Sequence, residues 1–120
     1  MKWTFDNDRP IYIQLVEGLT LAIVTGEFKQ GEKMPSVRDL AETLKVNPNT
    51  MQKALSELET SGLIRTERTN GRFVTDDMQQ IQKRKEALAQ EKALFYVKEM
   101  QKLGFTKKEA ITYLERKEIK

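Results

Sequence analysis

The chain of 120 residues is 38% hydrophobic and 32% charged and has no cysteine or histidine, which leaves room for one small core and excludes disulfides, thiolate metal sites and histidine-based catalysis. Its net charge of +3 lies entirely in residues 76–120, because residues 1–75 carry ten basic and ten acidic side chains, so bulk charge alone does not indicate a nucleic-acid partner. No apolar run approaches the roughly 18 residues of a transmembrane helix and no signal-peptide pattern opens the chain, so we expect a cytoplasmic protein without membrane contact.

The sequence contains no recognisable catalytic constellation. Its carboxylates are not accompanied by a nucleophile, a metal-binding motif or a glycine-rich phosphate loop. We therefore expect neither enzymatic activity nor a bound metal or cofactor.

The N-terminal part is predicted to be an arm followed by a helix. Residues 1–9 are polar apart from the alternating Trp3 and Phe5, which we expect to pack either on the domain or on a partner subunit. From residue 10 to residue 26 apolar side chains recur at helical spacing, and a glycine ends the helix. A turn follows, with at most one very short strand before Pro35, because proline keeps the preceding residue extended.

Two short amphipathic helices with a tight connection come next. The first is capped by Ser36, and the second by Asn47, with Pro48 at the first helical position, where a missing N–H costs nothing. Each helix has one apolar face at helical spacing, made of Val37, Leu40, Ala41 and Leu44 in the first and of Met51, Ala54, Leu55 and Leu58 in the second. Only Lys45 and Val46 separate them. This arrangement predicts a helix-turn-helix, whose second helix normally enters the DNA major groove.

A β-hairpin is predicted directly after the second helix. The β-rich runs 63–68 and 72–75 flank Asn70-Gly71, which favours a type I′ turn with positive φ at both central positions. A hairpin that follows a helix-turn-helix is a wing. We therefore expect a winged helix over residues 1–75.

Residues 76–120 are predicted to form a two-helix tail. A long helix should run from about residue 78 to residue 103, and a capping box from Thr106 to Glu109 should open the last helix. Apolar residues of the long helix form a partial seven-residue repeat, interrupted by Arg84 and Lys85. They predict a dimerisation surface of Ile81, Leu88, Leu94, Phe95, Val97 and Met100. The alternative is a cover packed on its own domain, but a helix of about 39 Å is longer than a domain of 75 residues easily covers.

The predicted fold is mainly α with a small β-hairpin. A winged helix-turn-helix DNA-binding domain, residues 1–75, is followed by a C-terminal two-helix dimerisation tail, residues 76–120.

Three stretches of the sequence resemble the GntR family of bacterial transcription regulators: Met34 to Ala41, Val46 to Thr50, and Ala54 to Ile64. The Asn-Pro-Asn-Thr opening of the second helix, in so short a chain, is similar to the YtrA-type subfamily. The resemblance implies a DNA-binding regulator that dimerises through its tail, and the YtrA-type likeness suggests transporter operons as targets. Full-size GntR regulators carry a large effector domain, for which we expect no room here.

Arg38 is the first candidate for DNA contact. It lies in the first turn of the first helix of the motif, and its guanidinium can grip a guanine or a phosphate with two hydrogen bonds. In GntR-like proteins the matching arginine touches DNA. The alternative is a salt bridge to Asp39 or Glu42.

The start of the second helix supplies polar candidates. The amides of Asn49 and Gln52 suit adenine, while Thr50 and Lys53 suit phosphates. Asn47 is equally explained as a helix cap. Pro48 removes one N–H donor and stands where many GntR relatives have an arginine.

The wing supplies the remaining candidates. Glycine at its tip, Gly71, lets the backbone approach a narrow minor groove, whose negative potential attracts arginine. The alternative is that Arg65 and its neighbours only solubilise the hairpin, with Glu67 diluting their charge. The complete predicted DNA-binding set is Ser36, Arg38, Asn47, Pro48, Asn49, Thr50, Gln52, Lys53, Arg68, Gly71 and Arg72.

We expect a sequence-specific regulator that binds double-stranded DNA as a homodimer and represses transcription at an inverted-repeat operator. One alternative is a winged helix used as a protein-interaction module, which an apolar exposed face on the second helix would favour. Another is a regulator with a small-molecule effector between tail and DNA-binding domain, although the sequence names no effector.

Overall fold

The computed structural model describes residues 3–116 and divides after Arg84 into two compact units, residues 1–84 and 85–120. Its elements run in the order α1 (Ile11–Val24), α2 (Val37–Leu44), α3 (Pro48–Thr60), β1 (Ile64–Glu67), β2 (Gly71–Val74), α4 (Met78–Lys102) and α5 (Lys107–Arg116). Residues 1–2 and 117–120, the outer ends of the two predicted domains, lie outside the described residues. The boundary predicted after Thr75 separates a DNA-binding part from a dimerisation part. It stays a prediction, because the division after Arg84 reflects only which residues contact one another.

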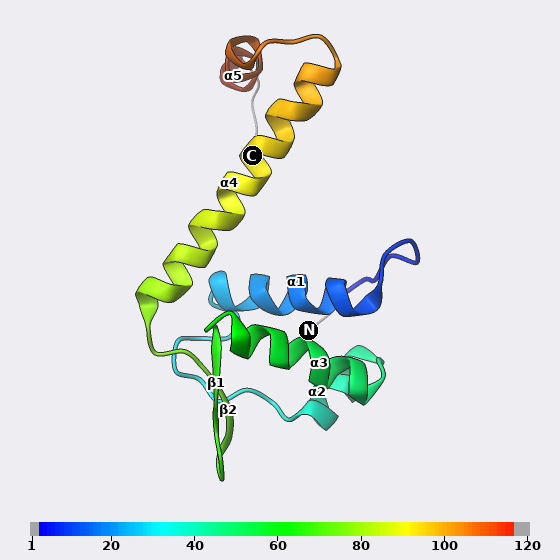
Figure 1. The fold of residues 1–120 in the computed structure, drawn as a ribbon, viewed down its shortest axis with the longest axis vertical. Coiled ribbons are helices and arrows are strands. Elements are labelled where there is room, and N and C mark those ends of the chain that lie inside the picture. The colour runs from blue at the N-terminus through cyan, green and yellow to red at the C-terminus, as the bar shows by residue number, and fades with distance from the viewer. Residues whose placement is uncertain (1–2, 117–120) are drawn as a thin grey trace. The chain divides into compact units, whose positions relative to one another are not determined.

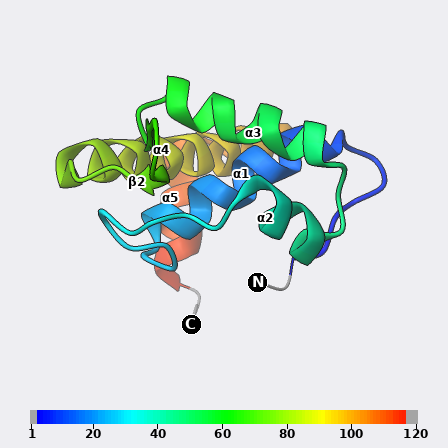
Figure 2. The same cartoon turned by 90° about the horizontal axis from the view of Figure 1, so that it is seen from below.

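The first unit is a three-helix core with a wing, which confirms the predicted fold (Figure 1). Both α1 and α2 pack on α3. In Figures 1 and 2, α2 lies near the start of α3 and the wing lies near its end. Burying one large apolar side chain stabilises a fold by about 1.5–3 kcal/mol. Those buried most completely are Leu15, Leu19, Ile23, Leu40, Met51, Leu55, Leu58, Leu63 and Val74.

The helix caps lie where the sequence predicts them. The Ser36 hydroxyl accepts a hydrogen bond from the Asp39 N–H at 3.1 Å, at the start of α2. The Asn47 side-chain oxygen accepts one from the Asn49 N–H at 2.7 Å, with proline in the first turn of α3. Between the helices Lys45 has a left-handed conformation, with φ of 57°. This residue makes the sharp turn that a two-residue connection requires.

The wing is an antiparallel hairpin with a short third strand beside it. β1 and β2 pair along their whole length. The very short strand predicted before Pro35 is a single bridge between Lys33 and Phe73. Next to it, the Met34 N–H donates to the Arg72 carbonyl oxygen at 2.8 Å. The segment that leads into α2 is therefore hydrogen-bonded to the wing.

The type I′ turn predicted at Asn70-Gly71 is wrong. Gly71 has a φ of 97°, but the φ of Asn70 is not positive. The Asn70 N–H donates to the Glu67 carbonyl oxygen at 3.2 Å, so Arg68 and Thr69 are the central residues of the turn. A loop of this length requires positive φ at one position only, and glycine occupies that position.

The N-terminal arm packs on its own unit. Gln14, buried on α1, exchanges hydrogen bonds of 2.8 and 2.9 Å with the backbone of Asp6 and donates to the Arg9 carbonyl oxygen at 2.9 Å. The Trp3 ring covers Gly18, where an added Cβ would lie only 2.7 Å from a ring carbon. The sequence allowed the aromatic side chains of the arm to pack on the domain or on a partner subunit. In the structure the Trp3 ring packs on its own domain.

The first residues of α4, up to Arg84, belong to the first unit. The Asp77 carboxylate caps the helix by accepting from the Gln79 N–H at 3.0 Å. The Gln80 side-chain amide donates to the Ser61 carbonyl oxygen at 2.9 Å, and Ile81 is buried.

The second unit is a helical hairpin of α4 from Lys85 onward and α5. The predicted capping box is present: the Thr106 hydroxyl accepts from the Glu109 N–H at 3.1 Å, and the Glu109 carboxylate accepts from the Thr106 N–H at 2.9 Å. The Tyr96 hydroxyl donates to the Ala110 carbonyl oxygen at 2.7 Å, which joins the two helices. Met100 and Ala110 are buried.

The six residues predicted for the dimerisation surface are not equally available. Ile81 and Met100 are 5% and 9% exposed, so the single chain already covers them. Leu94 and Phe95 are 55% and 66% exposed, while the two remaining residues, Leu88 and Val97, are half-buried. A seven-residue repeat identifies apolar side chains on one face of a helix, but it does not show whether the same chain or a second copy buries them.

Candidate nucleic-acid interface

The outward face of α3 is polar. Its apolar residues are buried against α1 and α2, which leaves Asn49, Gln52, Ser56 and Thr60 exposed on the other side. The Asn49 side chain has no partner among the described residues, and Gln52 makes only a long contact of 3.5 Å to Ser56. Both amides are therefore available to donate to and accept from base edges.

Arg38 is exposed at the start of α2. The salt bridge to Asp39 or Glu42 is not formed, and no other carboxylate of the described chain pairs with it. Its neighbour Ser36 is also exposed, with its hydroxyl engaged as the helix cap. A cation without an internal partner is free to pair with a phosphate or a guanine.

Lys53 is directed toward α1. Its ammonium lies 4.5 Å from the centre of the Tyr12 ring, a cation–π contact. The Tyr12 hydroxyl donates to the Glu57 carboxylate at 3.4 Å, and burial, followed by the nearby carboxylate, raises the pKa of Tyr12. Thr50 is half-buried on the same flank of the helix. These two predicted phosphate contacts therefore lie at the edge of the polar face.

The tip of the wing carries a free arginine beside a glycine. Arg68 is exposed and has no ion pair within the described residues. Gly71, three residues further on at the start of β2, is exposed and has positive φ. The side chain of Lys33 reaches this turn: its Cε lies 3.5 Å from where a Cβ on Gly71 would be. Sequence reasoning missed Lys33, and the only signal for it was the short strand that pairs it with β2.

Arg65 belongs to the base of the wing. Its guanidinium bonds the Glu67 carboxylate, lies 3.3 Å from the Asp76 carboxylate and stacks 4.9 Å from the centre of the Phe73 ring. The hydrogen bond to Glu67 is the main cause of the raised pKa of Arg65. Hydrogen bonds from Arg65 and then Asn70 lower the pKa of Glu67. The acidic residue expected to dilute the wing's charge thus organises its turn.

Arg72 is paired as well. Its Nε lies 3.1 Å from a carboxylate oxygen of Glu59 near the end of α3, and their side chains are 20% and 33% exposed. Of the eleven predicted residues, nine are exposed, including the cap Asn47 and Pro48, while Thr50 and Arg72 are half-buried. The guanidinium of Arg72 points instead to the chain itself.

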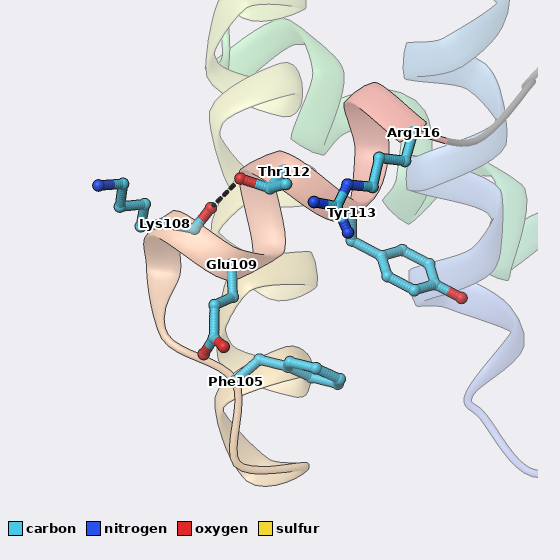
Figure 3. Close-up of a pocket in the computed structure, with 6 residues that line it drawn as sticks. All are labelled: Phe105, Lys108, Glu109, Thr112, Tyr113 and Arg116. Carbon is cyan, nitrogen blue, oxygen red and sulfur yellow. Dashed lines mark hydrogen bonds between the residues drawn. The ribbon is translucent and has the colours of Figure 1, made fainter.

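The second unit has a shallow cavity of about 320 Å³ beside α5 (Figure 3). Two aromatic rings, Phe105 and Tyr113, line it with their centres 6.4 Å apart, together with Arg116. The cavity is formed within this unit alone, and the predicted effector alternative stays a prediction. Across residues 3–116 there is no cluster of three His, Cys, Asp or Glu side chains that could hold a metal ion, nor any helix able to cross a membrane.

Comparison with known proteins assigns the chain to a family. Residues 11–74 match the model of the bacterial regulatory proteins of the gntR family. The chain is 37% identical over 107 residues to YhcF of Bacillus subtilis, an uncharacterised HTH-type transcriptional regulator, covering 89% of this chain and 88% of YhcF. It is 39% identical over 71 residues to the HTH-type transcriptional repressor YtrA of the same organism, covering 59% of this chain and 55% of YtrA.

Solved structures agree with the sequence matches. A GntR family transcriptional regulator from Listeria monocytogenes superposes with a TM-score of 0.88 at 38% identity, covering 95% of this chain and all of that one. The DNA-binding domain of AraR in complex with operator ORX1 superposes with a TM-score of 0.53 at 25% identity, covering 62% of this chain and 92% of that one.

Proposed function

Because this chain belongs to the GntR family of bacterial regulatory proteins, we propose that it represses transcription as a homodimer on an inverted-repeat operator. Family membership makes it a DNA-binding transcription regulator and not an enzyme. The proposal adds the direction of regulation, the oligomeric state, the form of the operator and the residues that contact it.

One observation carries the DNA contacts of this proposal. The polar face of α3 is exposed, and two exposed arginines, Arg38 at the start of α2 and Arg68 in the wing turn, form no ion pair among the described residues. α2 lies near the start of α3 and the wing near its end (Figure 1). In this proposal Asn49 and Gln52 read base edges in the major groove, Arg38 binds a guanine or a phosphate, and the wing tip enters the minor groove. Because α3 exposes polar and not apolar side chains, this surface favours DNA over a protein partner.

Exposed apolar side chains of the second unit support the homodimer. Leu94 and Phe95 of α4 are more than half exposed, and Leu103, Ile111 and Leu114 of the same unit are 74%, 48% and 43% exposed. A second copy of the unit would cover them. We therefore propose residues 76–120 as the dimerisation tail.

The direction of regulation is proposed from a relative. YtrA is named a transcriptional repressor, and a dimer that occupies promoter DNA blocks RNA polymerase without further partners. Transcription in vitro from a promoter that overlaps the bound site should fall as the protein is added. A rise would reverse this part of the proposal.

Selection from random-sequence DNA with the full chain tests the operator. A two-fold dimer should enrich an inverted repeat whose half-site centres lie about 34 Å apart on one face of the duplex. Enrichment of a single, unrepeated half-site would contradict the dimeric operator. Recovery of no sequence at all would favour the alternative of a protein-interaction module.

A further inference from the structure

We propose that Glu59 and Arg72 form a brace that positions the wing against α3, and that Arg72 acts on DNA binding through this brace and not by touching DNA. This inference rests on the proposed use of α3 and the wing on one operator. It makes Glu59, an acidic residue near the DNA-binding surface, a positioning residue for that function.

The first support is the geometry of the pair. The Arg72 Nε and the Glu59 carboxylate oxygen lie 3.1 Å apart, and the arginine side chain is only 20% exposed. Arg68, four residues before Arg72 in the wing turn, is exposed and has no ion pair among the described residues. Arg72 and Arg68 therefore occupy different environments, and because Arg65 is also paired, Arg68 is the arginine of the wing that is free to meet a phosphate.

The second support is where the brace lies. Of the ion pairs formed by residues 3–116, it is the one that joins α3 to the wing. The Arg72 carbonyl oxygen also accepts from the Met34 N–H at 2.8 Å, and Met34 stands just before the cap of α2. One residue thus connects β2, the end of α3 and the entrance to α2, the three pieces that would face DNA.

The third support is electrostatic. A free carboxylate at this place would repel the phosphates of DNA. The ion pair with Arg72 locally neutralises the charge of Glu59. A structural role therefore explains why an acidic residue occupies this position. Removing the charge of Glu59 should weaken DNA binding if Arg72 positions the wing, and should leave it unchanged or strengthen it if Arg72 contacts a phosphate.

The experiment uses the full chain and a duplex of about 30 base pairs that carries the selected inverted repeat. Fluorescence anisotropy gives the affinity at several salt concentrations for the parent, Glu59→Gln, Arg72→Gln, Arg72→Lys and the double variant Glu59→Gln/Arg72→Gln. Glu27→Gln is the matched control, because it removes one exposed carboxylate from the turn after α1.

If the brace positions the wing, Glu59→Gln weakens binding by about tenfold although it removes a negative charge, and Arg72→Gln weakens it equally. Arg72→Lys loses affinity too, because lysine keeps the charge but lacks the guanidinium Nε. The double variant binds no worse than either single variant. The slope of affinity against salt stays at the parent value throughout, and Glu27→Gln binds at least as tightly as the parent.

If Arg72 touches a phosphate, the results differ in sign. Glu59→Gln then binds as tightly as the parent or tighter, and Arg72→Gln lowers the salt slope by about one. Either result overturns the brace. A parent that binds neither the selected duplex nor mixed-sequence DNA overturns the proposed function and the role of the brace together.

The brace is also measurable without DNA. In ¹⁵N NMR spectra of the full chain, the Arg72 Nε–H should exchange slowly with solvent in the parent and rapidly in Glu59→Gln. Rapid exchange in the parent overturns the brace whatever the DNA measurements give.

Discussion

The four arginines of residues 36–75 fall into two groups by what they contact. Arg38 and Arg68 are exposed and without ion pairs in the described part of the chain, whereas Arg65 and Arg72 are bound to carboxylates of their own unit. The same residue type thus supplies both external contacts and internal order. Because paired charges contribute little to long-range attraction, the balanced charge of residues 1–75 does not exclude a local surface with free cations at Arg38 and Arg68.

Replacing Arg38 by Ala tests the first group. The loss should be about 1–3 kcal/mol of DNA-binding free energy per half-site. The melting temperature should change little, because the exposed side chain forms no ion pair with any described residue. Lys29→Ala, which removes an exposed cation from the turn before α2, is the control and should bind normally. Isothermal titration with the selected operator measures both. Equal affinity of the Arg38 variant and the parent would remove this residue from the interface.

The stability of the wing turn should decrease at acidic pH, when Glu67 becomes protonated. Hydrogen bonds from Arg65 and Asn70 lower the pKa of Glu67 in the folded chain. Its stabilising contribution is therefore complete above the ordinary glutamate pKa of about 4.3 and is lost as the pH falls through the lowered value. A ¹³C NMR titration of the Glu67 carboxyl should give a midpoint below about 4.3. A midpoint at or above it would mean that the turn is not organised by this carboxylate.

At the scale of elements, local signals predicted the helices well. The caps at Ser36 and Asn47, the capping box at Thr106 and the apolar spacing of α3 each depend on residues within one or two turns, so the sequence displays them directly. The positive φ of Gly71 was also predictable from glycine itself.

Features that depend on distant partners were not predictable in this way. Glu59 and Arg72 are 13 residues apart and meet only because the hairpin returns to the end of α3. Lys33 reaches the wing through a single bridge. Ile81 fits a dimer seam by its spacing, yet its own unit buries it. In each case the residue type indicated that the side chain would have a partner, but the identity of the partner depends on the three-dimensional fold.

Gly71→Ala tests the wing as an element. A Cβ there would meet Lys33 Cε at an ordinary 3.5 Å, so the cost arises from the φ of 97° and not from crowding. We expect about 1–2 kcal/mol of local strain, which distorts the turn and weakens operator binding while the helical core stays folded.

Gly26→Ala is the matched control for this strain. Gly26 has a φ of 84° with nothing within 4 Å of an added Cβ, and it lies after α1, away from the wing. It should lower the melting temperature by a similar amount but leave the DNA affinity of the folded chain unchanged. If both variants bind equally well, the shape of the wing does not contribute to binding.

For the whole molecule, operator recognition depends on the tail if the chain works as a dimer. α4 has 25 residues, about 37 Å of helix, and its C-terminal half exposes Leu94 and Phe95. Joining two DNA-binding units turns the second half-site contact into an intramolecular event, so affinity for an inverted repeat should far exceed that of one unit.

Phe95→Glu in the full chain tests this dependence. Phe95 is 66% exposed, so the substitution leaves the single chain folded, but it would place a charge in an apolar interface, where burial without a partner is costly. Sedimentation should show the parent as a dimer and the variant as a monomer at micromolar concentration. Affinity for the inverted repeat should fall by at least about a hundredfold, whereas affinity for an isolated half-site stays the same. Ala93→Glu adds the same charge to an exposed position on the opposite side of the helix and should remain dimeric. A parent that sediments as a monomer, or a Phe95 variant that still dimerises, would show that this face does not hold two chains together.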